Sequence, residues 1–310
     1  MSVIPARPFS AIICIPGLAW EVVPNLSPAS GSPTATGAYT TMPNGKVFIL
    51  YREGAVDGSE VNAVEFDPVT VTYSAPTLAS PDPLPSRQDY TGKMVVLSDG
   101  TILFCTNAGG AFLGWSYTYD RSTDSWATRI ATPNHFGDFG LVTVDGGDTA
   151  LKFGGQLRSN GFYYGNVESY DVATSSWVTL TQVIPLGLRY VVAVTLSDGR
   201  VLVGGGDTYG PAENYRYWFY APATEIFTET TSVPSALYLH NICNVLQLEN
   251  GKVFMAGDRV TTAVLFDPAT ESWSQFSIDS PITGDFTLNK LPDNERLLIT
   301  GPTCHILTTC

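Results

Sequence analysis

The segment that decides the fold is Phe266-Asp267-Pro268-Ala269-Thr270-Glu271-Ser272-Trp273, in which an aromatic residue, a turn and a second aromatic residue follow in fixed order. Related segments start their turns at Asp67, Asp120, Asp171 and Ala221. In all five, a large ring stands six residues after the start of the turn, at Tyr73, Trp126, Trp177, Phe227 and Trp273. Asp and Pro favour tight turns that reverse the chain, so each copy predicts two antiparallel strands with the ring on the second.

A second repeated feature is a short turn inside an apolar hairpin. It occurs at residues 43–46, 98–101, 145–148, 197–200, 249–252 and 292–295. Asn-Gly and Asp-Gly pairs predict type I′ turns here, because both residue types accept positive φ. Each repeat therefore contains four antiparallel strands, a to d, within about 50 residues, which is the organisation of a propeller blade.

The length of the chain sets the expected number of blades. Dividing 310 residues by the repeat length predicts six blades, with seven as the alternative count, in one domain covering residues 1–310. Their expected bounds are approximately 31–80, 86–132, 138–183, 189–234 and 240–279, with a closing blade made of 285–310 and 10–24. In that closing blade, Ala19 to Val23 supplies the missing strand d, so the chain ends pair and leave no free sheet edge.

The repeats resemble those of the kelch family. The resemblance rests on glycines that end strand b, on the ring six residues into the turn, and on an aromatic residue before it (Phe66, Tyr119, Tyr170, Tyr220 and Phe266). It covers almost the whole chain, but the first and fifth blades lack the doubled glycine, and Tyr73 and Phe227 replace tryptophan. The resemblance implies an all-β propeller. Kelch propellers include actin-binding proteins, ubiquitin-ligase substrate receptors, a copper oxidase related to galactose oxidase and viral attachment proteins, so the fold alone does not give the function.

Composition and charge exclude several classes of partner. The chain has 16 basic and 29 acidic residues, a net charge of −13. Nucleic acid is therefore not expected, because tracking phosphates needs clustered Lys and Arg. No apolar run approaches the roughly 20 residues of a membrane span, so membrane insertion is not expected either. The apolar stretch from Ala11 to Ile15 is shorter than the about 7–15 residues of an export signal, so no signal peptide is predicted.

The predicted binding residues lie in the loops on one face of the ring. The a–b and c–d turns share one face, so the b–c loops and d–a connections form the other, which we call the loop face. Loops on a rigid scaffold usually carry binding, and Tyr, Trp and Arg are enriched at interaction hot spots. The predicted set is Arg87, Tyr90, Trp115, His135, Tyr163, Tyr164, Arg189, Tyr190, Tyr209, Tyr215, Tyr217, Tyr238 and His240. The alternative is that individual rings cap the core or pack on neighbouring loops.

Two enzyme classes are alternatives that the resemblance raises. A copper oxidase would use two histidines and two tyrosines, and imidazoles such as His135 and His240 suit copper. Yet the chain has no adjacent Tyr-His pair, and Cys105 has no evident cross-linking partner. A sialidase would use arginines such as Arg87 and Arg189 to hold a carboxylate, but glycoside hydrolysis needs two paired carboxylates, and none stand at a defined spacing. We therefore expect a non-enzymatic protein with no catalytic residues, no metal and no cofactor.

The five cysteines do not form a disulfide scaffold. Cys105 and Cys243 fall in blades on opposite sides of the ring and are expected to be small buried hydrophobic residues. Cys14 and Cys310 should both lie near the interrupted turn of the closing blade, so a disulfide between them is a possible fastening of the closure.

The function expected from these features is binding or assembly on the surface of a virus particle, with a bacteriophage tail or capsid-associated protein as the best guess. The acidic, lysine-poor composition is typical of a surface exposed outside cells, and without an export signal, lysis would explain that exposure. The expected partners are other virion structural proteins and a host cell-surface glycan or protein. The alternative is an intracellular, cytoplasmic kelch adaptor, although no BTB or F-box domain accompanies the propeller.

Overall fold

The computed structural model describes residues 19–22, 38–52, 61–74, 92–106, 114–127, 130–134, 137–157, 160–205, 216–230, 243–257, 262–277, 287–290, 296–300 and 305–308. Among these, the backbone alone is described for residues 19–22, 51–52, 61–62, 243–244, 257, 262, 276–277, 287–290, 296–300 and 305–308.

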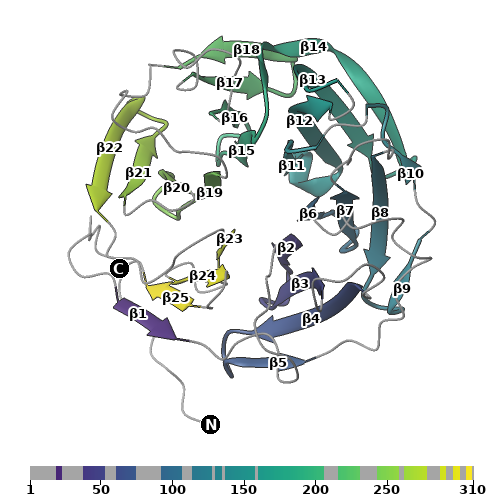
Figure 1. Cartoon of the computed structure of the whole chain (residues 1–310), viewed down its shortest axis with the longest axis vertical. Helices are drawn as coiled ribbons and strands as arrows, with labels where there is room; N and C mark the ends of the chain where they lie inside the picture. Colours follow the sequence, from purple (N-terminus) through teal and green to yellow (C-terminus); the bar gives the residue numbers. More distant parts are fainter. Residues whose placement is uncertain are drawn as a thin grey trace.

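Antiparallel sheets stand side by side around a central axis, and this radial arrangement is a β-propeller (Figure 1). Blade 1 contains β2 (Ala38–Thr41), β3 (Val47–Arg52), β4 (Val61–Asp67) and β5 (Thr72–Ser74). Blade 2 contains β6 (Gly92–Val96), β7 (Ile102–Thr106), β8 (Trp115–Asp120), β9 (Ser125–Trp126) and β10 (Ile130–Ala131). Blade 3 contains β11 (Gly140–Val144), the 3₁₀ turn η1 (Asp145–Gly147), β12 (Thr149–Leu157), β13 (Phe162–Asp171) and β14 (Ser176–Leu188). Blade 4 contains β15 (Val192–Thr195), β16 (Val201–Gly204), β17 (Tyr217–Ala221) and β18 (Ile226–Glu229). Blade 5 contains β19 (Cys243–Gln247), β20 (Val253–Gly257), β21 (Thr262–Asp267) and β22 (Ser272–Ser277).

The chain ends form a separate terminal sheet. It contains β1 (Ala19–Val22), β23 (Thr287–Lys290), β24 (Arg296–Thr300) and β25 (His305–Thr308), in the order β1-β25-β24-β23. β1 pairs antiparallel with β25, with Ala19 opposite Thr308. Its innermost strand β23 lies between β19 and β2, so the terminal sheet occupies the sector between blades 5 and 1 (Figure 1).

The predicted count of six four-stranded blades was wrong. The structure has five blades rather than six, if a blade is a sheet built from one continuous segment with its own c–d turn. The repeated aromatic–turn–aromatic segment occurs five times, and each copy belongs to one blade, whereas the terminal sheet has no such turn and joins two distant parts of the chain. Dividing the length by the repeat counted the two ends as one more repeat. In addition, blade 2 has five strands, and β14 of blade 3 runs to Leu188 rather than ending at residue 183.

The prediction of type I′ turns holds at residues 145–148, where both central residues, Gly146 and Gly147, have positive φ and the amide of Asp148 donates to the carbonyl of Asp145, but it was wrong for four other a–b hairpins. In these four turns the glycine has positive φ, at Gly45, Gly100, Gly199 and Gly251, but the Asn or Asp before it does not. The amide of Gly45 donates to the carbonyl of Met42, and the amide of Met42 donates to the carbonyl of Lys46. This pattern is a type I turn followed by a glycine bulge. Pro43 favours this turn, because its ring holds φ near −65°, the value that the first central residue of a type I turn takes.

Four of the five repeated rings pack between neighbouring sheets, as the sequence predicted, whereas Tyr73 packs on the core of its own blade, with its ring centroid 4.9 Å from that of Phe66. Trp126 packs on the core between blades 1 and 2, Trp177 between blades 2 and 3, and Phe227 between blades 3 and 4. Trp273 of blade 5 lies 5.2 Å from Tyr217 of blade 4, measured between ring centroids. The hydrophobic core is therefore a series of interfaces between blades, and it holds the loop face on a rigid ring.

Candidate functional site

The best-described part of the loop face belongs to blade 3. Here β12 and β13 extend as a hairpin whose tip is the turn at residues 160–161, and β14 runs beside β13 to Leu188. At the tip, the amide of Phe162 donates to Asn160 Oδ1 and the Asn160 side chain donates to the hydroxyl of Tyr164. These bonds organise a hairpin tip on which the Phe162 ring is 56% exposed.

The guanidinium of Arg189 lies over the rings of two of the predicted binding tyrosines. Its guanidinium carbon lies 5.2 Å from the centroid of the Tyr163 ring and 4.8 Å from that of Tyr190. A guanidinium over an aromatic face is attracted by the negative charge of the ring face, and the stacking orients its N–H donors. We call Tyr163, Arg189 and Tyr190 the stacked cluster. All three side chains are partly exposed.

The backbone that carries the stacked cluster is anchored on both sides. Tyr190 has a φ of 54°, a conformation that is uncommon for residues other than glycine and that is concentrated at ligand sites and switches. The next residue, Val191, donates its amide to the carbonyl of Asp138 at 3.0 Å and accepts from Lys93 Nζ at 3.3 Å. Lys93 lies on β6 of blade 2, so the cluster stands close to the ring of innermost strands and near a second cation.

Two other residues of the predicted binding set lie in the core. Tyr217 is only 4% exposed, and its ring packs against Trp273. Its hydroxyl lies close to Gly205, because a Cβ added to Gly205 would stand 2.4 Å from the hydroxyl oxygen. The prediction of Tyr217 as a loop-face ligand residue needs correction, because strand β17 begins at this residue and turns its ring into the interface with blade 5. Trp115, the first residue of β8, is half-buried against the core of blades 1 and 2. These two rings pack on the core, as the alternative interpretation of the loop aromatics predicted.

Most other predicted residues lie outside the described part of the chain. They are Arg87, Tyr90, His135, Tyr209, Tyr215, Tyr238 and His240, together with both cysteines of the proposed disulfide, Cys14 and Cys310. The structure thus brings together Tyr163, Arg189 and Tyr190, with Tyr164 on the same hairpin.

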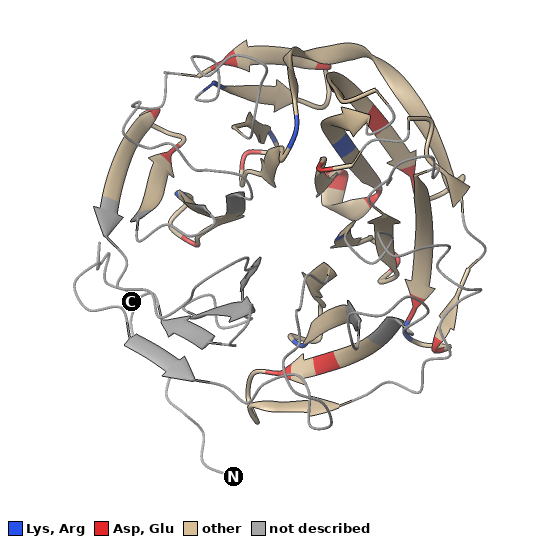
Figure 2. Cartoon of the chain, in the orientation of Figure 1, with Lys and Arg blue, Asp and Glu red and all other residues tan. Residues whose placement is uncertain are grey.

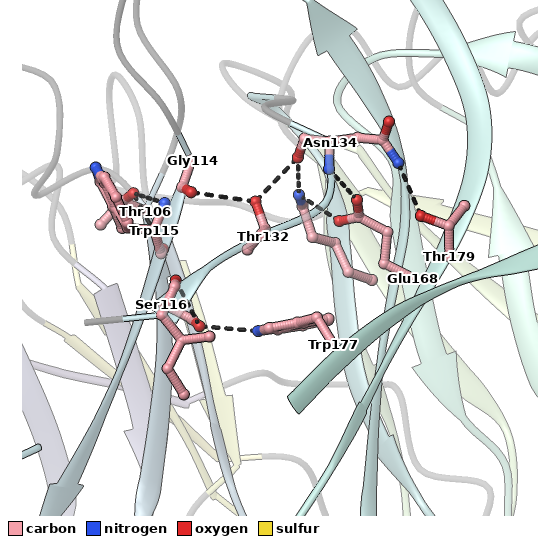
Figure 3. A network of polar contacts seen from close by, with 11 residues as sticks. Thr106, Gly114, Trp115, Ser116, Thr132, Asn134, Glu168, Trp177 and Thr179 are labelled. Carbon is pink, nitrogen blue, oxygen red and sulfur yellow. Dashed lines mark hydrogen bonds and ion pairs between the residues drawn. The ribbon is translucent and has the colours of Figure 1, made fainter. Parts of the chain in front are cut away.

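Sequence reasoning missed a buried polar network between blades 2 and 3 (Figure 3). Lys152 Nζ donates to Glu168 Oε2 at 2.7 Å and to the carbonyl of Asn134 at 3.0 Å, while Glu168 Oε1 accepts the amide of Asn134. Nearby, Trp177 Nε1 donates to Ser116 Oγ, which in turn donates to the carbonyl of Ile130. The signal in the sequence was a charged residue in the middle of each of two strands that are otherwise mainly apolar, β12 and β13.

The network holds the connection from blade 2 to blade 3 in place. Both charged side chains are almost completely buried, at 2% and 1% exposure, and Lys152 also lies 5.0 Å from the Phe139 ring centroid. Buried charges require this kind of pairing and hydrogen bonding, since desolvation of an isolated ion is very unfavourable. Cys105 lies in the same interface, and its burial raises the pKa of the thiol to about 12, so it is protonated at neutral pH. The Lys152–Glu168 pair is closed to solvent, so a dissolved ligand cannot reach it without opening of the interface.

Two further observations concern the described residues only. No group of three His, Cys, Asp or Glu side chains among them lies close enough together to hold a metal ion. Within the same part of the chain, no helix has the length and hydropathy of a membrane span.

The fold defines the class of the protein as a β-propeller, built almost entirely from strands. No family model matches the chain, and no curated protein matches it.

Proposed function

We propose that this protein is a non-enzymatic binding propeller with kelch-like repeats, carried on the outside of a virus particle. In this proposal it contributes to assembly of the particle or to attachment to the host. The observation that carries the binding role is the stacked cluster of Tyr163, Arg189 and Tyr190 on the loop face. It combines aromatic surface and an oriented cation on a rigid scaffold, which is the composition of interaction hot spots.

The chemistry of the stacked cluster supports a polar, anionic ligand group. A guanidinium held between rings presents a planar fork of donors that matches a carboxylate. Tyrosine rings offer apolar area to sugar faces, and their hydroxyls can donate to or accept from sugar hydroxyls. A host cell-surface glycan that carries acidic sugars fits this combination, and a cell-surface protein with an exposed carboxylate is the other candidate ligand.

The binding role is tested with purified protein on an array of neutral and acidic glycans and on whole host cells. We expect Tyr163→Ala and Arg189→Gln each to reduce binding at least tenfold while the thermal unfolding midpoint changes little. The control is Ile226→Ala, which removes an exposed side chain from the outer strand β18, away from the loop face. Undiminished binding by both variants would show that this cluster does not recognise the ligand.

The virion role needs a separate test. The gene for this chain is expected to stand among genes for head and tail proteins, and mass spectrometry of purified virus particles should detect the chain in fixed stoichiometry with the structural proteins. Absence of the chain from purified particles would refute the virion role and would favour the cytoplasmic adaptor, whatever the outcome of the binding assay.

A further inference from the structure

The segment that carries Tyr190 is held in place at the residue that follows it. Val191 is 1% exposed, and both of its backbone polar groups have partners in other parts of the ring. Its amide donates to the carbonyl of Asp138 at 3.0 Å, and its carbonyl accepts from Lys93 Nζ at 3.3 Å. Both peptide groups that flank Val191 are therefore held, the first by Asp138 and the second by Lys93.

The Asp138 anchor also fixes the other tyrosine of the stacked cluster. Gly137, the residue before Asp138, exchanges two backbone hydrogen bonds with Gln156, at 2.9 and 2.8 Å. Gln156 stands directly opposite Tyr163 in the pairing of β12 with β13. Gly137 and Asp138 thus connect the hairpin that carries Tyr163 to the segment that carries Tyr190, and they set the spacing between the two rings.

Two glycines leave room for the Val191 side chain. Gly154 on β12 has a φ of 58°, and a Cβ added there would stand 3.0 Å from one methyl carbon of Val191. On β11, a Cβ added to Gly140 would stand 3.2 Å from the other methyl carbon. Val191 is thus packed against two strands of blade 3 as well as bonded on both sides, so Tyr190 is attached to a rigid base.

Lys93 reaches Val191 from a different part of the ring. It lies on β6, the innermost strand of blade 2, whereas Val191 directly precedes β15 of blade 4, and β11 of blade 3 stands between these two strands (Figure 1). Basic residues are the minority in this chain, 16 against 29 acidic ones (Figure 2). Nevertheless two of them, Lys93 and Arg189, contact the same short segment, one by a hydrogen bond to the backbone and the other by stacking.

We propose that Lys93 is a positioning residue of the stacked cluster: by holding the carbonyl of Val191, it keeps the Tyr190 ring against the Arg189 guanidinium. Tyr190 has a φ of 54°, and a left-handed conformation at a residue other than glycine persists only where surrounding contacts enforce it. Without the Lys93 bond the segment relaxes and the ring leaves the guanidinium. The effect on ligand binding rests on the proposed function, whereas the effect on the geometry of the cluster does not.

Nuclear magnetic resonance tests the geometry in Lys93→Met, which keeps the length of the side chain but removes its charge and its donors. The Arg189 guanidinium lies over two rings, so ring currents shift its N–H signals, which are assigned by their absence in Arg189→Gln. We expect these signals to move toward their positions in the unfolded chain. Exchange of the Val191 amide should become about tenfold faster, the effect of losing one charge-assisted hydrogen bond from the closed segment.

The matched control is Lys252→Met. Lys252 lies in an a–b turn, on the face opposite the loop face and 3.4 Å from Asp267, so its replacement removes a partly exposed lysine without touching the cluster. A second variant, Lys93→Gln, is one bond shorter than lysine and carries no charge, so it should shift the same signals as Lys93→Met. Wild-type signals and wild-type Val191 exchange in the folded Lys93 variants would overturn the proposal.

Ligand binding distinguishes positioning from direct contact. With sialyllactose as the probe and neutral lactose as the comparison, Lys93→Met should bind about tenfold more weakly than the wild type. Lys93→Arg keeps a charged donor and should recover most of the affinity together with the Arg189 signals. Weaker binding with unchanged Arg189 signals would refute the positioning role, because Lys93 would then contact the ligand itself. If the wild type does not bind sialyllactose, the acidic-glycan ligand is wrong, and the Arg189 signals and Val191 exchange still decide the role of Lys93.

Discussion

Lys152 and Glu168 form an ion pair at 2.7 Å in the interface between blades 2 and 3, where both side chains are almost completely buried. They stand 16 residues apart in sequence and directly opposite each other on β12 and β13. Glu168 accepts a hydrogen bond from the amide of Asn134, and Lys152 donates one to the carbonyl of Asn134. The pair thus links strands β12 and β13 of blade 3 to the chain segment that connects blade 2 to blade 3.

Removing one partner of this pair should be strongly destabilising. In Lys152→Met the Glu168 carboxylate stays buried without its cation, and we expect a loss of about 3–5 kcal/mol in the free energy of unfolding. The double variant Lys152→Met/Glu168→Leu removes both charges and should recover a large part of that loss. Urea unfolding followed by tryptophan fluorescence measures both. If the double variant is no more stable than the single one, the hydrogen bonds to Asn134, rather than the balance of charge, account for most of the lost stability.

Acid should destabilise the c–d turns. Hydrogen bonds from the Thr174 hydroxyl and amide lower the pKa of Asp171, and equivalent bonds lower those of Asp67 and Asp120. Because these pKa values are lower in the folded than in the unfolded chain, their contribution is present above the unfolded value of about 3.9 and is lost as the pH falls through the folded value. Asp171→Asn keeps the acceptor oxygen but cannot titrate. Its urea midpoint should therefore fall less than that of the wild type between pH 6 and pH 3.

Cys105 should be unreactive in the folded protein. The thiol is fully buried and its pKa is raised to about 12 by desolvation, so the reactive thiolate is scarce at neutral pH. Treatment with iodoacetamide at pH 7.5 followed by peptide mass spectrometry should leave Cys105 unmodified, and labelling should be complete in 6 M guanidinium chloride. Rapid labelling of the native protein would mean that the interface between blades 2 and 3 opens frequently.

The glycine bulge in the a–b turns gives a conformational prediction. Gly199 has a φ of 85°, and a Cβ built there meets nothing within 4 Å, so any effect of Gly199→Ala comes from the backbone alone. A left-handed alanine costs about 1–2 kcal/mol, whereas asparagine accepts this conformation more readily. Thermal unfolding should therefore rank the wild type above Gly199→Asn, and Gly199→Asn above Gly199→Ala. Equal midpoints for all three would contradict the assigned turn.

Two tyrosines of the predicted binding set should behave in opposite ways on truncation. Tyr217→Ala empties a buried site beside Trp273 and should cost about 3–5 kcal/mol, as for other large aromatic residues in cores. Tyr163→Ala removes a partly exposed ring and should change the free energy of unfolding by less than about 1 kcal/mol. Calorimetric unfolding of the two variants distinguishes the core role from the surface role.

The amino-acid sequence by itself determined the strand order within each blade, the position of the turns and the inward packing of the repeated rings. These features depend on local patterns, such as Asp and Gly at turns and a ring at constant spacing from Asp171 or Asp267. Only the tertiary structure decided which polar groups meet across blades, as Lys152, Glu168 and Asn134 do. The physical reason is that a blade is covered on both faces by its neighbours, so buried and exposed positions do not alternate along its inner strands. Tyr217 and Tyr163 are therefore hard to distinguish in the sequence, although one is buried between two blades and the other is stacked on Arg189 at the surface.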